Sequence, residues 1–164
     1  MGNIGLDMRE MPYGRRRSPL NILSGEEIEA LKEDIAAIEA DESVFVFNDD
    51  RFSGTAYISL LDKIAVRGNV FPDMDSIHPR DLLSPRAVLA HEYYGHRPYR
   101  DTKMRVGDWR DEFRASYMAA KSAPGLSGED KRLLVLDAIE RAKEAGVSIT
   151  YNDFMRGVLY ESAQ

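Results

Sequence analysis

A helix start and two of the three histidines share one short stretch, Ser84–His96 (SPRAVLAHEYYGH). Ser84 is a favourable N-cap, and Pro85 at the first helical position gives up only an N–H group that would have had no partner. The apolar residues that follow continue the helix. We therefore predict a helix over residues 85–94, and Pro98 ends any regular helix soon afterwards.

Three side chains of this stretch suggest a metal site. His91 and His96 lie five residues apart, and Glu92 lies between them. Neutral imidazole is a good ligand for zinc, and a carboxylate beside the first ligand can act on water held by the metal. We therefore take His91 and His96 as candidate metal ligands and Glu92 as the candidate general base.

The spacing of the histidines places a demand on the structure. Five steps of about 100° would turn the two side chains about 140° apart on a regular α-helix. One ion can be shared only if the helix is bulged or broken near Tyr94 and Gly95. Gly95 can absorb an extra residue or adopt a positive φ without a Cβ penalty.

The motif His-Glu-x-x-Gly-His, formed here by residues 91–96, resembles the metal motif of the TldD/PmbA-type metallopeptidases. The resemblance implies that His91 and His96 are metal ligands and that Glu92 is the catalytic base. It covers about six residues.

A second resemblance lies downstream, in residues 112–120 (EFRASYMAA). This stretch resembles the Glu-x-x-Ala-x-x-x-Ala helix of ImmA/IrrE-type and other glutamate-zincin peptidases, which implies that Glu112 is the third metal ligand. The small residues Ala115, Ser116 and Ala119 share the face of Glu112, so this helix can approach the histidine helix closely. Asp111 is an alternative ligand, although it points about 100° away from that face.

Other patterns complete the expected fold. Ser24 and Glu27 have capping-box spacing and begin a helix that should run to about residue 40. Short connections favour an antiparallel meander of three strands over residues 43–47, 54–60 and 63–67. A surface loop should occupy residues 69–83, and helices should span 108–122 and 127–145, with a short element over 152–160. The order of elements from residue 24 to 120 resembles a minimal zincin domain, and residues 84–160 resemble uncharacterised proteins of bacterial mobile elements.

Length and composition indicate one domain. The chain has 164 residues, of which 43% are hydrophobic and 30% charged, as in globular proteins. We predict an α+β fold in which the small meander packs with about four to five helices, over residues 21–164. We expect residues 1–20 to form an irregular basic arm that carries Arg15, Arg16 and Arg17. The arm is either a solvated extension or a basic patch that binds an acidic partner.

Charge and cysteine content exclude several classes of function. The net charge of −6 disfavours general binding to nucleic acids, and the absence of cysteine excludes disulfides and thiolate zinc sites. No apolar run reaches the roughly 20 residues that span a bilayer, and residues 1–20 lack the apolar stretch of a secretory signal. We therefore expect a cytoplasmic protein without a membrane partner.

Together these residues predict a zinc-dependent metallopeptidase whose partner is a peptide or protein substrate. Glu92 would take a proton from the attacking water, while Tyr94 or Tyr99 would stabilise the oxyanion. Manganese or iron would also suit two imidazoles and a carboxylate. One alternative is a non-catalytic metal-binding module, and another is a hydrolase of a non-peptide amide or ester.

Two further residues have open roles. We expect His78 to be a loop residue, with the mouth of the cleft as its alternative place. We expect Trp109 to anchor the first turn of its helix in the core rather than to bind substrate.

Overall fold

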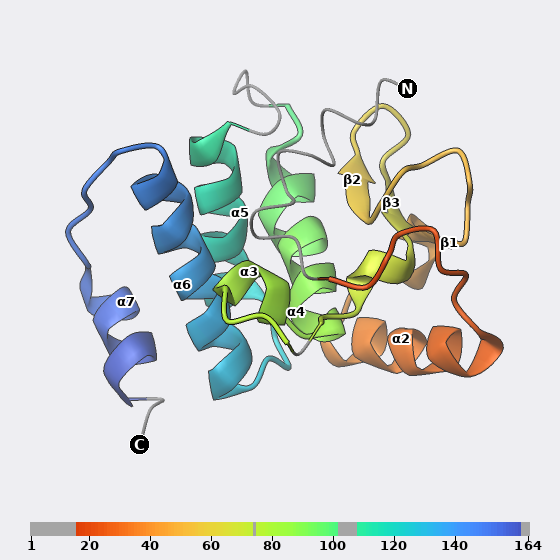
Figure 1. Ribbon diagram of the computed structural model, residues 1–164, viewed down its shortest axis with the longest axis horizontal. Coiled ribbons are helices and arrows are strands. Elements are labelled where there is room, and N and C mark those ends of the chain that lie inside the picture. Colours follow the sequence, from red (N-terminus) through yellow and green to blue (C-terminus); the bar gives the residue numbers. More distant parts are fainter. Residues whose placement is uncertain (1–15, 74, 102–107, 162–164) are drawn as a thin grey trace.

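A computed structural model describes residues 16–73, 75–101 and 108–161, and it has an α+β fold (Figure 1). The elements in chain order are α2 (Gly25–Ala37), η1 (Glu42–Val44), β1 (Phe45–Phe47), β2 (Ala56–Ile58), β3 (Lys63–Val66), η2 (Gly68–Val70), α3 (Pro79–Leu82), α4 (Pro85–Ala90), η3 (His91–His96), η4 (Arg97–Tyr99), α5 (Trp109–Ser122), α6 (Gly128–Glu144), α7 (Asp153–Arg156) and η5 (Gly157–Glu161). The basic residues of the predicted arm before Arg16 lie outside the described part. No described helix combines the length and apolar character needed to cross a membrane.

One side of the molecule consists of helices, and the other side combines the sheet with α2. Helices α5 and α6 lie side by side, and the α4–η3 segment lies between them and the three-stranded sheet, which has α2 beneath it (Figure 1). The core runs through all of these elements, and Leu31, Ile64, Leu89 and Leu134 are among its fully buried side chains. The α4–η3 segment is therefore held on both sides, by helices and by the sheet.

The predicted antiparallel meander is wrong, because the strand order is β1-β3-β2 and β1 runs parallel to β3. Only β2 and β3 form an antiparallel pair, through a tight turn in which Asp62 has φ 50°. The segment of residues 48–55, which connects β1 to β2, is too long for such a tight turn. The side chain of Asn48 bonds to the backbone of Leu23, and Arg67 donates to the carbonyls of Asp49 and Phe52. These contacts carry the chain past β3, so β2 pairs with the edge of β3 opposite to β1.

Most predicted helix boundaries are confirmed by their caps. Ser24 and Glu27 form the expected capping box, and Ser84 and Ser127 cap α4 and α6. Helix α6 ends before Gly146, which has φ 76°. The predicted loop over residues 69–83 is only partly irregular, because it contains the end of η2 and the short helix α3.

Arg16 is an internal anchor of this loop. Its guanidinium donates to four backbone carbonyls, those of Asn69, Val70, Arg80 and Leu83, at 2.7–3.0 Å. Burial lowers the pKa of Arg16 to about 10, although Asp81 and Asp137 oppose the shift. Arg17 pairs with Glu27 and lies over the ring of Phe71. Both arginines therefore stabilise the folded domain.

We predict that Arg16→Met destabilises the protein by about 2–4 kcal/mol, because four carbonyls lose a charged donor that no apolar side chain replaces. Arg132→Met is the matched control, since Arg132 is exposed and pairs only with Glu129 among the contacts described; its cost should stay below about 1 kcal/mol. Urea unfolding of both variants measures the difference. Equal midpoints would show that Arg16 is not an anchor.

Candidate metal centre

The helix that carries the two histidines changes from α-helical to π-helical winding at His91, in the region where the spacing of the histidines predicts a bulge. Residues 85–90 are α-helical, and residues 91–96 form a π-helix, in which hydrogen bonds join residue i to residue i+5. This winding brings side chains five residues apart onto one face. The Nε2 atoms of His91 and His96 lie 3.1 Å apart, so the predicted bulge is confirmed.

Gly95 permits a very close contact between this segment and α5. A Cβ atom on Gly95 would lie 2.3 Å from the carbonyl oxygen of Ala115 and 2.6 Å from its Cα atom. The described glycines with positive φ are Gly125 and Gly146, so Gly95 does not serve as a left-handed residue. The close approach of two backbones explains why the bulge carries glycine at this position.

Glu112 completes a triangle of ligand atoms. Its Oε1 atom lies 3.1 Å from Nε2 of His91 and 3.4 Å from Nε2 of His96. Tetrahedral ligands at 2.0–2.1 Å from a zinc ion lie about 3.3 Å from one another. The three edges therefore match the ligand spacing that zinc requires, and these residues form a group able to hold a metal ion.

The face of α5 that carries Glu112 is smooth, as the sequence indicates. Ala115, Ser116 and Ala119 are fully buried against the neighbouring elements. Small side chains let α5 pack directly on η3, so the short carboxylate of Glu112 reaches both imidazoles. The structure thus brings together the three predicted ligands from two elements.

Each imidazole is supported through its second nitrogen. Nδ1 of His91 lies 2.8 Å from the hydroxyl of Ser116, which in turn donates to Asp137 at 2.6 Å. Nδ1 of His96 lies 3.5 Å from Asp111. Hydrogen bonds of this kind fix the orientation of metal-binding histidines. Asp111, considered above as a substitute ligand, lies behind His96 instead of beside the triangle.

The two supporting carboxylates are balanced by arginines. Asp137 is fully buried, and Arg80 and Arg141 both contact its Oδ1 atom at 3.3 Å. Burial raises the pKa of Asp137, but these two arginines outweigh it and keep the pKa below its ordinary value. Asp111 pairs with Arg114 at 3.1 Å. Ser116, Asp137 and Arg141 were not singled out as site residues in the sequence, because Ser116 counts there as a small packing residue and α6 as a core helix.

The carboxylates around His96 favour its protonated form. Burial disfavours the charged form of His96, but Asp111 and Glu112 outweigh it and raise its pKa well above the ordinary value. Burial also disfavours the Glu112 carboxylate, whose pKa is nevertheless held well below the ordinary value by His91 and His96. A metal ion and a proton therefore compete for the imidazole of His96.

Glu92 lies between the ligands and the sheet. Its side chain is buried, and Oε1 accepts a hydrogen bond of 2.9 Å from the backbone N–H of Tyr57 in β2. The charge of Glu92 also contributes to the raised pKa of His96. The candidate base is therefore held by an edge strand of the sheet, close to the candidate metal ligands.

The two tyrosines predicted to stabilise an oxyanion have other contacts. The hydroxyl of Tyr94 donates to the carbonyl of Ile38 at 2.6 Å, which directs it to the end of α2. The ring of Tyr99 lies under the guanidinium of Arg114, with 4.3 Å between its centroid and Cζ. Tyr94 thus supports helix packing, and Tyr99 lies beside the pair formed by Arg114 and Asp111.

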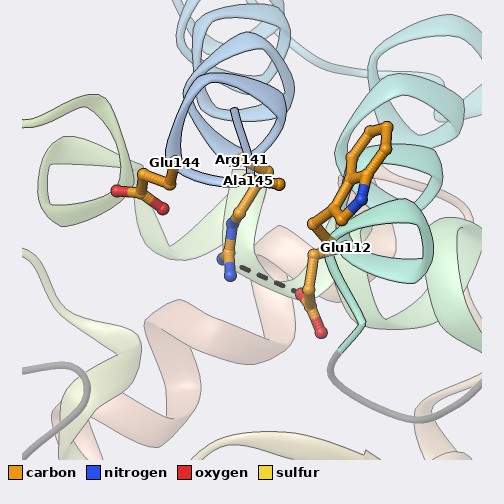
Figure 2. Close-up of a pocket in the computed structure, with 5 residues that line it drawn as sticks. Glu112, Arg141, Glu144 and Ala145 are labelled. Atoms are coloured by element: carbon orange, nitrogen blue, oxygen red, sulfur yellow. Dashed lines mark ion pairs between the residues drawn. The ribbon is translucent and has the colours of Figure 1, made fainter. Parts of the chain in front are cut away.

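A cavity of about 220 Å³ adjoins Glu112. It is lined by Trp109, Glu112, Arg141, Glu144 and Ala145. Figure 2 shows Arg141 directed from α6 toward Glu112, while Glu144 points away from that pair. Trp109 precedes Glu112 by about one turn of α5 and lines this cavity. Our prediction of a core position for Trp109 is wrong, because its side chain is only half-buried and lies outside the hydrophobic core.

His78 belongs to an ion-pair group next to the cavity. It caps α3, because Nδ1 accepts from the N–H of Arg80, and Nε2 lies 3.5 Å from Glu144. Glu140 is also close enough to share an ion with His78 and Glu144. Arg80 pairs with Glu144 at 2.9 Å, however, so Glu144 already has a cationic partner.

We predict that Gly95→Ala disrupts the centre, because the added methyl group meets the backbone of α5 and the two segments must move apart. Zinc affinity should fall by at least about tenfold, and stability by about 2–4 kcal/mol. Gly25→Ala is the control, since a Cβ atom there has nothing within 4 Å. Unchanged zinc affinity in Gly95→Ala, measured against a chromophoric chelator, would contradict the close-contact explanation.

We further predict that Ser116→Ala lowers zinc affinity by about 10–100-fold, because His91 loses the support of its Nδ1 atom. Ser122→Ala, at the exposed end of the same helix, should bind zinc like the wild type. Chelator competition measures both variants. Equal affinities would mean that the hydroxyl does not orient His91.

Comparison with known proteins provides no further assignment, since no protein-family model, curated protein or solved structure matches the chain. The functional argument therefore depends on the geometry of His91, His96 and Glu112 and on the groups around them.

Proposed function

We propose that this protein is a small zinc-dependent metallopeptidase of the zincin type. The observation that supports the proposal most strongly is the triangle of two Nε2 atoms and one carboxylate oxygen, with edges of 3.1–3.4 Å. Catalytic zinc sites commonly use three protein ligands and leave a fourth position for water or substrate. His91, His96 and Glu112 would hold the ion.

The ligand set suits zinc, although manganese and iron also bind imidazole and carboxylate groups. A bound divalent cation supplies Lewis acidity, which polarises a carbonyl group and makes water more acidic. The chain contributes the orientation of the ligands, since Ser116 supports His91 and Asp111 supports His96.

Glu92 is the general base in this proposal. The N–H of Tyr57 holds Oε1 in place, so we assign proton transfer to Oε2. A carboxylate oriented in this way takes a proton from the attacking water and later gives it to the leaving amine. The same hydrogen bond joins the catalytic segment to the sheet.

The outer edge of β2 is the proposed binding surface for a peptide substrate. The N–H of Tyr57 points away from β3, its antiparallel neighbour, and toward Glu92. In an antiparallel strand the C=O group of a residue points to the same side as its N–H group. An extended peptide that adds to this edge would therefore run past Glu92.

One observation favours a second function, that of a non-catalytic metal-binding module. Glu92 already has a structural partner in the backbone of Tyr57, so its carboxylate could serve only to attach η3 to the sheet. In that case the ion would stabilise the fold, and Glu92 would have no proton to transfer.

Glu92→Gln separates the two functions, because glutamine keeps an oxygen for Tyr57 but is not a base. We predict that the wild type contains one zinc ion per chain and cleaves members of a peptide library detected by mass spectrometry. Glu92→Gln should keep the zinc and lose about 10²–10⁴-fold in rate. Glu33→Gln, on the exposed face of α2, is the control. Stoichiometric zinc without any cleavage by the wild type would favour the module, and the absence of any bound divalent metal would exclude both functions.

A further inference from the structure

The cavity next to Glu112 has the size and place of a substrate pocket. Its volume is about 220 Å³, smaller than the roughly 300–1,000 Å³ of pockets for drug-sized ligands. A group as large as one amino-acid residue suits this space. Because Glu112 lines the cavity and also belongs to the triangle, a molecule bound at the ion would lie next to this cavity.

Arg141 lies at the boundary between the triangle and the cavity. Its Nη2 atom is 3.7 Å from Oε1 of Glu112, the same oxygen that faces both histidines. Its Nε atom donates to Oδ1 of Asp137 at 3.3 Å, which fixes the guanidinium. A guanidinium has five N–H donors in a planar fork, so it can retain Asp137 and still bind a carboxylate.

The charges around the cavity favour an anion once the ion is present. Glu144 is paired with Arg80, and Asp137 is shared between Arg80 and Arg141. A divalent cation would offset the charge of Glu112, and Arg141 would then be the cationic side chain that lines the cavity. Trp109 adds an aromatic wall for an apolar side chain.

We propose that Arg141 binds the carboxylate of a substrate that is hydrolysed next to its C-terminus. This inference rests on the metal-dependent hydrolase proposed above and narrows its substrates to peptides or acyl amino acids with a free terminal carboxylate. The terminal residue occupies the cavity beside Trp109, and the preceding residues lie along β2. Water forms the new C–O bond, the C–N bond breaks, and the amine leaves as the terminal amino acid after it receives a proton from Glu92.

The test compares 3-phenylpropanoate (the acid) with 3-phenylpropanamide (the amide), two probes without the acylated amine that would be hydrolysed, as ligands of the zinc-loaded protein by ligand-observed NMR titration. We expect the wild type to bind the acid at least about tenfold more tightly than the amide, since a charged hydrogen bond contributes about that factor. Arg141→Met should remove this preference. Lys143→Met should retain it, because Lys143 is exposed on the same helix and contacts Glu140 instead.

Ala145→Leu provides an independent test, because Ala145 lines the cavity but is itself exposed and contributes no charge. The larger side chain should weaken binding of the acid by about tenfold without a change in zinc content. If Arg141→Met does not retain zinc, this variant provides the test instead. Wild-type protein that holds zinc but shows no preference for the acid, a preference that survives in Arg141→Met, or unchanged acid binding in Ala145→Leu would overturn the inference. Wild-type protein without zinc would instead refute the proposed function.

Discussion

The contact between the backbones of Gly95 and Ala115 is the constraint on which the rest of the site depends. Two helical segments can approach this closely only where one lacks a side chain and the other presents small ones. The approach lets the short carboxylate of Glu112 reach the histidines of the neighbouring segment. The π-helical turn then aligns His91 with His96, which a regular helix would direct apart. The close packing of η3 on α5 therefore also sets the distances between the three candidate ligands.

A buried charge network supports this contact from the side of α6. A fully buried carboxylate is costly unless it is paired, and Asp137 has two arginines and the hydroxyl of Ser116 as partners. Arg80 belongs to α3 and so connects the network to that helix. Its own backbone carbonyl accepts a hydrogen bond from Arg16. The orientation of His91 therefore depends on residues from several distant parts of the chain.

Local patterns, together with the resemblance that indicated Glu112, could predict much of this protein, whereas the other long-range partners of the site could not be predicted. The caps at Ser24 and Ser84 are local, and the bulge follows from the odd spacing of the histidines. The parallel pairing of β1 with β3 depends on contacts of the loop over residues 48–55, which no alternation pattern records. Asp137 supports the site through Ser116 from a helix whose sequence indicates only core packing. Such partners become visible only when the helices are placed.

The most direct test of this account is an anomalous difference map, recorded at the zinc edge from crystals of zinc-loaded protein. The account predicts one strong peak within about 2.0–2.2 Å of Nε2 of His91, Nε2 of His96 and a carboxylate oxygen of Glu112. A peak located elsewhere, or no peak in protein prepared with zinc, would contradict the central claim that these three side chains form a metal centre.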